Sequence, residues 1–400
     1  MNTCAPLYAS VTGSRPGFRP ADATVEAMPL RPGDVVAAQR VQDVAAHDDS
    51  VAVRLVAGPG TGKSATIEER FRWLYGDHAA PPDSVFGVSF TRAASKDLKL
   101  RVAAHCSAHG VPGTADEIRI TTLHSLALAT LARANRLAQF PVRPRVFDEW
   151  EVENVFDAEF SAQSGRTPAR CQEIRKSREA FWSLGGLSPA NYIQPDPPIS
   201  GEEERAFLAF HRPTTQTYAG VLPGEIVRLC VDAMEAGLLP AAELLGMRHL
   251  IVDEYQDLNP IDIRFIDRLH DEGVSIFVAG DDDQSVYAFR FASPGGIQDF
   301  PTRHEGAGDH VLEGCFRCST SIVRASNRLI ENFSPSTRIP KELVSLWESA
   351  DPPVDGVLHH WRFARHNVEA SAIAESCTRL IEAGIAPVQI MILLRACANR

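Results

Sequence analysis

Three polar side chains follow two short apolar segments of the chain, close to where each segment ends. Asp253 and Glu254 come directly after residues 250–252, and Gln284 follows residues 276–279. An aspartate at the end of a strand can hold a magnesium ion, and a neighbouring glutamate can accept a proton from an attacking water. The amide of Gln284 can contact a terminal phosphate without bringing a repelling charge. These residues predict the hydrolysis of a phosphate compound.

A structural role also fits the same residues. A helix is expected to begin near Pro260, and a carboxylate or amide before it, such as Asp257 or Asn259, can cap that helix. The amide of Gln284 can likewise stabilise its own loop. The sequence alone leaves both roles open.

A glycine-rich loop lies upstream of these residues, between an apolar segment and a helical pattern. Residues 51–57 predict a strand, residues 58–64 read Gly-Pro-Gly-Thr-Gly-Lys-Ser, and apolar residues recur at helical spacing from Ile67. Backbone N–H groups of such a loop can surround phosphate oxygens, Lys63 can reach the β and γ phosphates, and Ser64 can offer its hydroxyl to magnesium. Although position 57 is alanine where the strict pattern has glycine, the order of elements predicts a phosphate-binding loop.

The chain has 400 residues, of which 44% are hydrophobic and 23% charged, so we expect a globular protein of two or three domains. No apolar run approaches the roughly 18 residues that span a bilayer. Eight cysteines are too few for a disulfide framework in a chain of this length, and the pair Cys315 and Cys318 lacks the second pair of a zinc site. We therefore expect a cytoplasmic location, reduced thiols and no membrane partner.

The net charge of −11 argues against a protein that wraps nucleic acid by bulk attraction, although a local basic channel is compatible with it. One basic cluster precedes the acidic run 202–204. Its members are Arg166, Arg170, Arg175, Lys176 and Arg178. A solvated helical face and a DNA-facing surface explain this cluster equally well.

Several further segments carry polar and aromatic residues in a fixed order. They are Ser89–Ala94, Thr122–Ala127, and Leu312–Glu313 with Phe316–Arg317, in addition to Ala57–Ser64, Asp253–Asp257 and Gly280–Tyr287 with Arg290. Taken in order, these segments resemble the motifs of the superfamily 1 DNA helicases of the UvrD/Rep type. The resemblance extends from about residue 35 to the end of the chain.

The resemblance implies an α/β fold: a RecA-like P-loop NTPase domain with a parallel sheet flanked by helices, an inserted α-helical domain and a partial second RecA-like domain. Lys63 and Asp253 stand 190 positions apart, more than a compact P-loop domain needs, and an inserted domain fills that gap. We predict the first domain over residues 31–128 and 216–308, the helical domain over 129–215 and the second over 309–400. Residues 1–30 show no sustained period and predict a flexible leader.

For the nucleotide, the resemblance implies ATP with Mg²⁺. Phe316 is expected to stack on the adenine, and Arg317 to contact the γ phosphate. A glutamine upstream of the loop is expected to read the adenine edge, where Gln42 has the better spacing and Gln39 is the alternative. The predicted catalytic residues are Lys63, Asp253, Glu254, Gln284 and Arg317. The predicted ATP contacts are Gln42, Ala57, Gly58, Pro59, Gly60, Thr61, Gly62, Lys63, Ser64 and Phe316, with Ser64 and Asp253 on Mg²⁺.

For DNA, the resemblance implies a single strand held by aromatic faces and by polar contacts to its backbone. The expected aromatic residues are Phe90, Tyr287 and Phe289, and the expected backbone contacts are Thr91, Thr122, His124 and Ser125. The family has a glycine where this chain has Phe291.

Two functions from different classes remain open. The first is an ATP-dependent DNA helicase that moves 3′ to 5′ along single strands and separates duplex at junctions. The second is a truncated or degenerate module that binds ATP and DNA without productive turnover unless a protein partner or a missing C-terminal half completes it. Intact Lys63, Glu254 and Arg317 favour the first, whereas the expected absence of motifs V and VI favours the second. A small-molecule kinase is disfavoured by the DNA-type motifs.

Overall fold

The structure is a computed structural model that describes residues 32–186, 195–286, 291–334, 337–349 and 355–394. The chain divides into two compact units, one of residues 30–356 and one of residues 1–29 with 357–400. In the second unit the described elements are helix α15 (His366–Glu382) and a 3-10 turn at Pro387–Gln389. The elements described below belong to the unit of residues 30–356.

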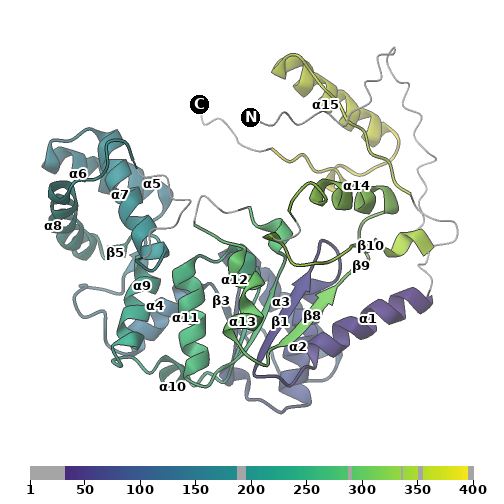
Figure 1. The fold of residues 1–400 in the computed structure, drawn as a ribbon, viewed down its shortest axis with the longest axis horizontal. Coiled ribbons are helices and arrows are strands. Elements are labelled where there is room, and N and C mark those ends of the chain that lie inside the picture. The colour runs from purple at the N-terminus through teal and green to yellow at the C-terminus, as the bar shows by residue number, and fades with distance from the viewer. Residues whose placement is uncertain (1–31, 187–194, 287–290, 335–336, 350–354, 395–400) are drawn as a thin grey trace. The chain divides into compact units, whose positions relative to one another are not determined.

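A six-stranded sheet forms the centre of this unit (Figure 1), and every pairing between its strands is parallel. Its spatial order is β3 (Arg119–Thr121), β2 (Val85–Val88), β6 (His249–Val252), β7 (Ser275–Gly280), β1 (Ala52–Ala57) and β8 (Gly308–Leu312). Strands β1 and β2 are buried throughout, as expected for a parallel sheet covered on both faces. Because all six strands run the same way, their carboxyl ends meet at one edge.

Helices cover the two faces of the sheet in separate hydrophobic layers. Alternate residues of β1 point to opposite faces, so Val53 and Leu55 pack in one layer while Ala52 and Val56 pack in the other. The first layer contains α1 (Pro32–Ala46), α2 (Lys63–Gly76) and α3 (Arg92–Ala108). The second contains α4 (Leu123–Arg133), α9 (Glu225–Glu235), α10 (Ala241–Leu245), α11 (Pro260–Asp271), α12 (Gly295–Gln298) and α13 (Phe300–Arg303). The predicted α/β fold with a helix-flanked parallel sheet is confirmed.

A helical region between α4 and α9 has a core of its own. It comprises β4 (Arg145–Val146), α5 (Glu149–Glu151), a π-helical turn at Val152–Phe156, α6 (Asp157–Ser164), α7 (Pro168–Ser183), α8 (Gly201–Tyr218) and β5 (Gly220–Val221). Phe156, Phe160, Phe207 and Phe210 form an aromatic cluster at its centre, with ring centroids 5.1–6.0 Å apart. Helix α7 packs against α9 and α11, which joins this region to the sheet domain.

The chain after the sheet forms a smaller layer. Strand β9 (Gly314–Cys315) pairs in parallel with β10 (Val344–Ser345), and α14 (Thr320–Ile330) lies between them in sequence. A 3-10 turn at Leu346–Ser349 follows β10. Three further 3-10 turns lie at Pro82–Ser84, Tyr255–Asp257 and Asp282–Gln284. Two of these turns directly follow β6 and β7, so they lie at the edge where the strands end.

The structure also tests two expectations from the sequence, the lack of a membrane-spanning segment and the presence of reduced thiols. None of the helices in the described part of the chain combines the length and the apolar character needed to cross a membrane. The six described cysteines are free thiols, as predicted: Cys106, Cys171, Cys230, Cys315, Cys318 and Cys377.

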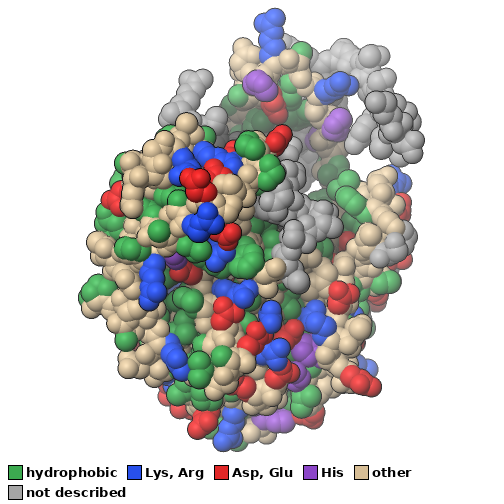
Figure 2. Space-filling model, turned by 60° about the vertical axis from the view of Figure 1, so that its left-hand side comes forward, with side chains coloured by type: hydrophobic (Ala, Val, Ile, Leu, Met, Phe, Trp, Pro, Cys, Tyr) green, Lys and Arg blue, Asp and Glu red, His purple; other side chains and the backbone are tan. Residues whose placement is uncertain are grey.

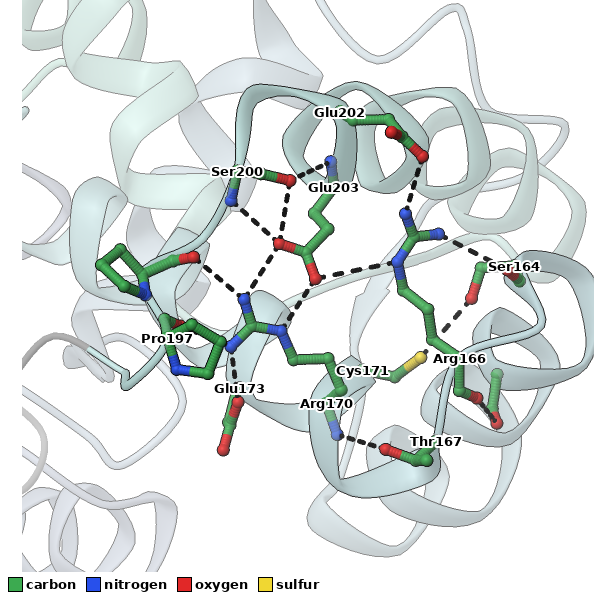
Figure 3. Close-up of polar contacts among 12 residues, drawn as sticks. Ser164, Arg166, Thr167, Arg170, Cys171, Glu173, Pro197, Ser200, Glu202 and Glu203 are labelled. Carbon is green, nitrogen blue, oxygen red and sulfur yellow. Dashed lines mark hydrogen bonds and ion pairs between the residues drawn. The ribbon is translucent and has the colours of Figure 1, made fainter.

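The basic cluster of the helical region is an ion-pair network. Arg170 donates two hydrogen bonds to Glu203, at 2.8 and 2.9 Å, and Arg166 lies against Glu202 and Glu203 (Figure 3). Arg178 pairs with Glu204 in the same way, at 3.0 Å. On the face shown in Figure 2, basic and acidic side chains are interspersed.

Most of this cluster therefore joins α7 and the turn before it to α8. Arg175 is the exception, because its buried pair is with Asp157 on α6, at 2.8 Å. Lys176, the remaining member of the cluster, is exposed. The ion pairs give four of the five basic residues a partner within the protein, and the choice between a solvated face and a DNA-facing surface stays open.

Glu203 gives this network a testable pH dependence. The hydrogen bonds from Arg170, with those from Ser200, lower the pKa of Glu203 to about 2. Since the folded pKa lies below that of an unfolded glutamate, the ionised form stabilises the fold above about pH 4.5, and this contribution is lost as the pH falls toward 2. We expect Glu203→Gln to lower the melting temperature by about 2–4 °C at pH 7 and by much less at pH 3.

Thermal melts followed by circular dichroism measure this effect. The matched control is Glu202→Gln, because Glu202 also pairs with Arg166 but its side chain is 80% exposed. We expect little change from the control at either pH. Equal destabilisation by the two variants would contradict the assignment.

Candidate functional site

A pocket of about 610 Å³ opens at the edge where the strands end. Loops after β1, β6 and β7 contribute to it, together with α1, α3 and the segment after β9. It is lined by Gln39, Gln42, Ala57, Gly58, Pro59, Gly60, Gly62, Lys63, Ser64, Ala65, Arg101, Glu254, Gln284, Phe316 and Arg317. The pocket thus brings together residues that lie more than 250 positions apart in the sequence.

The glycine-rich loop joins the end of β1 to the start of α2. Gly60 and Gly62 have φ angles of 75° and 97°, a region that glycine enters without steric cost. Lys63 is the first residue of α2, so backbone N–H groups of the loop and the helix N-terminus face the pocket. The predicted strand, loop and helix are all present.

Thr61, a predicted ATP contact, points its side chain into the loop and away from the pocket. Its side chain is buried and donates a hydrogen bond to the carbonyl oxygen of Gly58, at 2.8 Å. Its own carbonyl accepts a hydrogen bond from the amide of Gln42, at 2.8 Å. Thr61 therefore fixes the shape of the loop and is absent from the pocket lining. Since Gln39 and Gln42 both line the pocket, the choice of adenine-reading glutamine stays open.

Lys63 lies between the two carboxylates that follow β6. Its ammonium nitrogen is 3.0 Å from Asp253 Oδ1 and 2.6 Å from Glu254 Oε2. Burial alone would lower the pKa of Lys63, but the two carboxylates outweigh burial and raise it. Burial likewise acts to raise the pKa of Glu254, but the charge of Lys63 together with the hydrogen bonds from Lys63 and Gln256 outweighs burial, so the pKa is lowered. Asp253 is buried behind Lys63, whereas Glu254 lines the pocket as an ionised group that can accept a proton.

Gln256 holds Glu254 in place, a role that the sequence reading missed. The backbone of Glu254 has a φ of 56°, which is uncommon for a residue with a side chain and costs of the order of 1 kcal/mol. The amide of Gln256 donates to Glu254 Oε2 at 2.8 Å, and its oxygen accepts from the backbone N–H of Asp281 at 3.1 Å. One buried amide therefore joins the loop after β6 to the loop after β7.

Gln284 lies in the 3-10 turn after β7, with its side chain at the pocket. Its amide donates to Asp281 Oδ2 at 2.7 Å, so the side chain has a fixed direction. Both roles that the sequence left open for Gln284, contact with a terminal phosphate and stabilisation of its own loop, therefore fit the structure. The same side chain stabilises the turn and lines the pocket.

Phe316 and Arg317 close one wall of the pocket directly over the glycine-rich loop. The backbone N–H of Phe316 donates to the carbonyl oxygen of Gly60 at 2.9 Å. A Cβ atom on Gly60 would lie only 2.6 Å from Cβ of Arg317, and one on Gly58 only 2.4 Å from a methyl group of Leu343. The absence of side chains at these two loop positions allows Arg317 and Leu343 to approach the loop.

The predicted nucleic-acid contacts lie at two neighbouring helix N-termini. Thr91 caps α3 by accepting from the backbone N–H of Ala94, and Thr122 caps α4 by accepting from that of Ser125, at 3.1 and 3.3 Å. The strands that precede them, β2 and β3, are paired in parallel, so both caps lie at the same edge as the pocket. Helix N-termini with accessible hydroxyl groups suit phosphate oxygens.

The other predicted nucleic-acid contacts are less fully defined. Phe90 and His124 are both partly exposed beside these caps, while Tyr287 and Phe289 lie outside the described residues, as does Arg290. Phe291 has a φ of 64°, which is the left-handed backbone conformation that favours glycine. Phenylalanine adopts this conformation at the position where the family has a glycine.

Arg101 on α3 is a further pocket residue, and no sequence motif predicted it. It pairs with Glu68 at 3.2 Å and reaches the pocket because α3 packs against α2. Such a position depends on tertiary packing, which no local motif encodes.

A family model of the UvrD/REP helicase N-terminal domain matches residues 38–218 and 235–305. The chain belongs to this family. The match includes the glycine-rich loop, both carboxylates, Gln284 and both helix caps, and it includes the helical region that separates Lys63 from Asp253 in the sequence.

Curated members of this group are similar along most of the chain. UvrD2, an ATP-dependent DNA helicase of Mycobacterium tuberculosis H37Rv, is 26% identical over 87% of this chain and 50% of its own length. DNA helicase II of Escherichia coli K12 is 26% identical over 70% of this chain and 38% of its own, and the ATP-dependent DNA helicase PcrA of Bacillus subtilis is 25% identical over 78% and 41%. The chain spans about half the length of the curated relatives it matches.

The approach of Arg317 to Gly60 yields a prediction for nucleotide affinity. In Gly60→Ala the new Cβ meets Arg317 and the φ of 75° becomes strained, at about 1–2 kcal/mol. We expect the dissociation constant of a fluorescent ATP analogue to rise about tenfold in an equilibrium titration.

Gly246→Ala is the matched control for this variant. Gly246 has a φ of 67° with open space around its missing side chain, and it lies at the end of α10, outside the pocket lining. We expect the control to keep the affinity of the unmodified chain. An unchanged affinity in Gly60→Ala, or an equal loss in both variants, would refute the pocket geometry.

Proposed function

We propose that this chain is the ATP-hydrolysing part of an ATP-dependent DNA helicase, which binds single-stranded DNA and moves 3′ to 5′ along it. The observation that carries the proposal is the single pocket shared by the glycine-rich loop, Glu254, Gln284 and Arg317. Each group has the chemistry that phosphoryl transfer to water needs: phosphate binding, proton acceptance, contact with the γ phosphate, and a positive charge for the transition state.

ATP is the proposed substrate, with Mg²⁺ as its companion ion. The hydroxyl of Ser64 and the carboxylate of Asp253 are hard oxygen donors of the kind that Mg²⁺ takes from a protein when phosphates supply other ligands. The ion would neutralise charge on the phosphates. Lys63 would contact the phosphates, Glu254 would accept the proton of the attacking water, and Arg317 would stabilise charge from the opposite wall. Phe316 offers a flat face for the adenine.

Single-stranded DNA is the proposed nucleic-acid partner. Thr91 and Thr122 lie at the sheet edge where the ATP pocket also opens, and His124 and Ser125 lie in the first turn of α4. Backbone contacts of this kind are independent of sequence, as a motor requires. Phe90, Tyr287 and Phe289 remain the proposed stacking residues.

The alternative is a module that binds ATP and DNA but turns over only when a partner or further sequence completes the second motor domain. It deserves a separate test because the chain spans about half the length of its curated relatives. Duplexes with a 3′ or a 5′ single-stranded tail separate the two proposals. Unwinding of the 3′-tailed duplex alone supports the helicase, whereas ATP and DNA binding without unwinding of either supports the module.

Phosphate release with and without an oligonucleotide tests the hydrolytic assignment. We expect release to depend on single-stranded DNA. Lys63→Ala should weaken nucleotide binding and abolish release, because the cation facing the phosphates is lost. Glu254→Gln should bind nucleotide within about threefold of the unmodified chain while release falls by about 10²–10⁴, the usual value of a general base. Release that ignores both DNA and these substitutions would sink the assignment.

A further inference from the structure

Lys341 is a buried lysine at the centre of three consecutive aspartates. Its side chain is 2% exposed, and its ammonium nitrogen lies 2.9 Å from Asp281 Oδ1 and 2.7 Å from Asp283 Oδ2, with a third contact to Asp282. Among the described residues, these aspartates are also the one group of three or more His, Cys, Asp or Glu side chains whose ligand atoms lie close enough together to share a metal ion. In this chain an internal ammonium group occupies that position.

The segment that carries Lys341 makes further contacts to the same aspartates. We call residues 337–345 the strap. Arg338 donates two hydrogen bonds to Asp283, at 3.0 and 2.7 Å, and the backbone N–H of Ile339 donates to Asp282 at 2.6 Å. Burial alone would lower the pKa of Lys341, but the three carboxylates outweigh it and raise the pKa, so the group stays charged.

The strap continues from the aspartates to the glycine-rich loop. Leu343 lies over Gly58, where a Cβ atom would come within 2.4 Å of it. The next residues form β10, which pairs with β9 immediately before Phe316 and Arg317. One short segment therefore contacts the turn after β7, the phosphate-binding loop and the wall that carries Arg317.

Asp281 connects Lys341 to two residues of the pocket, Gln284 and Glu254. One oxygen of Asp281 contacts Lys341, and the other accepts the hydrogen bond from the amide of Gln284, at 2.7 Å. The backbone N–H of Asp281 donates to Gln256, which in turn holds Glu254. The backbone N–H of Asp283 also donates to Asp281, at 3.1 Å, and the amide of Gln298 to Asp282, at 3.1 Å, but both donors are uncharged. Without Lys341, Arg338 would be the one cation among the described partners of the three aspartates, and repulsion between the carboxylates would move the side chain of Asp281.

We propose that Lys341 is a positioning residue, which holds Asp281 and through it aims the amide of Gln284 at the γ phosphate. This inference rests on the proposed function, because it concerns how the ATP pocket recognises a triphosphate. It assigns to the strap a role in sensing the nucleotide in addition to packing.

The test compares two nucleotides that differ at the γ phosphate. Dissociation constants for Mg–ADP and for the non-hydrolysable Mg–AMP-PNP are measured by calorimetry on the full chain and on Lys341→Met, which keeps an unbranched side chain of similar length and removes the charge. We expect AMP-PNP to bind about tenfold more weakly to the variant and ADP to stay within twofold. Gln284→Ala should give the same pattern without the loss of melting temperature that Lys341→Met causes.

A second variant separates positioning from folding. Lys341→Met with Asp282→Asn restores the charge balance of the cluster, yet it leaves Asp281 without its ammonium partner. We expect the melting temperature to recover while the AMP-PNP affinity stays reduced. The matched control is Arg324→Met, since Arg324 pairs with Glu348 just beyond the strap at an exposed position and should leave both dissociation constants unchanged.

Two outcomes would overturn the inference while leaving the proposed function intact. The first is an unchanged ratio of the two dissociation constants in Lys341→Met. The second is recovery of AMP-PNP affinity together with melting temperature in the double variant, which would make Lys341 purely structural. If the unmodified chain binds neither nucleotide, the proposed function fails and the inference falls with it.

Discussion

Parallel strand pairing is the constraint on which the rest of the structure depends. Strand β1 pairs with β7, and β7 with β6, so the loops after these strands must leave the sheet side by side. This pairing sets Lys63 against Asp253 and Glu254 although about 190 positions separate them in the sequence. Ligand sites of open α/β sheets lie at such an edge for the same reason. The helical region between α4 and α9 interrupts the chain without interrupting the pairing.

Backbone proximity is the second condition for the site. The glycine-rich loop accepts Arg317 and Leu343 at distances that a Cβ atom would not allow. The glycines of the loop therefore have two roles. Their N–H groups face the pocket, and the absence of a Cβ atom lets the segment after β9 pack against the loop backbone. The wall with Phe316 and Arg317 and the strap with Lys341 belong to that one segment. Its position therefore governs both the placement of Arg317 at the pocket and the turn that carries Gln284.

Local patterns predicted the parts of the site that are encoded locally. The glycine loop and the two carboxylates after β6 lie where strand ends and a helix start place them. The resemblance supplied the fold and pointed to Thr91 and Thr122, whose role as helix caps came only from the structure. Gln256 and Lys341 were missed because their roles come from contacts across the fold, where a buried amide or ammonium group joins loops that are distant in sequence. The hydroxyl of Thr61 closes the loop by donating to Gly58, a contact that no local pattern predicted, and the ATP contact of Thr61 remains a prediction.

The ion pairs of the basic cluster in the helical region also could not be predicted from the sequence. Composition alone left a solvated face and a DNA-facing surface equally open, since both need only exposed arginines. The structure pairs Arg166, Arg170 and Arg178 with acidic residues of α8, a match set by the packing of two helices. The predicted domain boundaries and the individual site roles remain predictions, as do Tyr287 and Phe289, which lie outside the described residues.

In the proposed function, one pocket combines the glycine-rich loop with Arg317 of the segment after β9 for the hydrolysis of ATP. Single-turnover hydrolysis by Arg317→Ala, in the presence of single-stranded DNA, tests it most directly. An arginine that stabilises the transition state contributes about 10³–10⁵ to the rate, so we predict a fall of that order with nucleotide affinity kept within about tenfold. A hydrolysis rate equal to that of the unmodified chain would contradict the account.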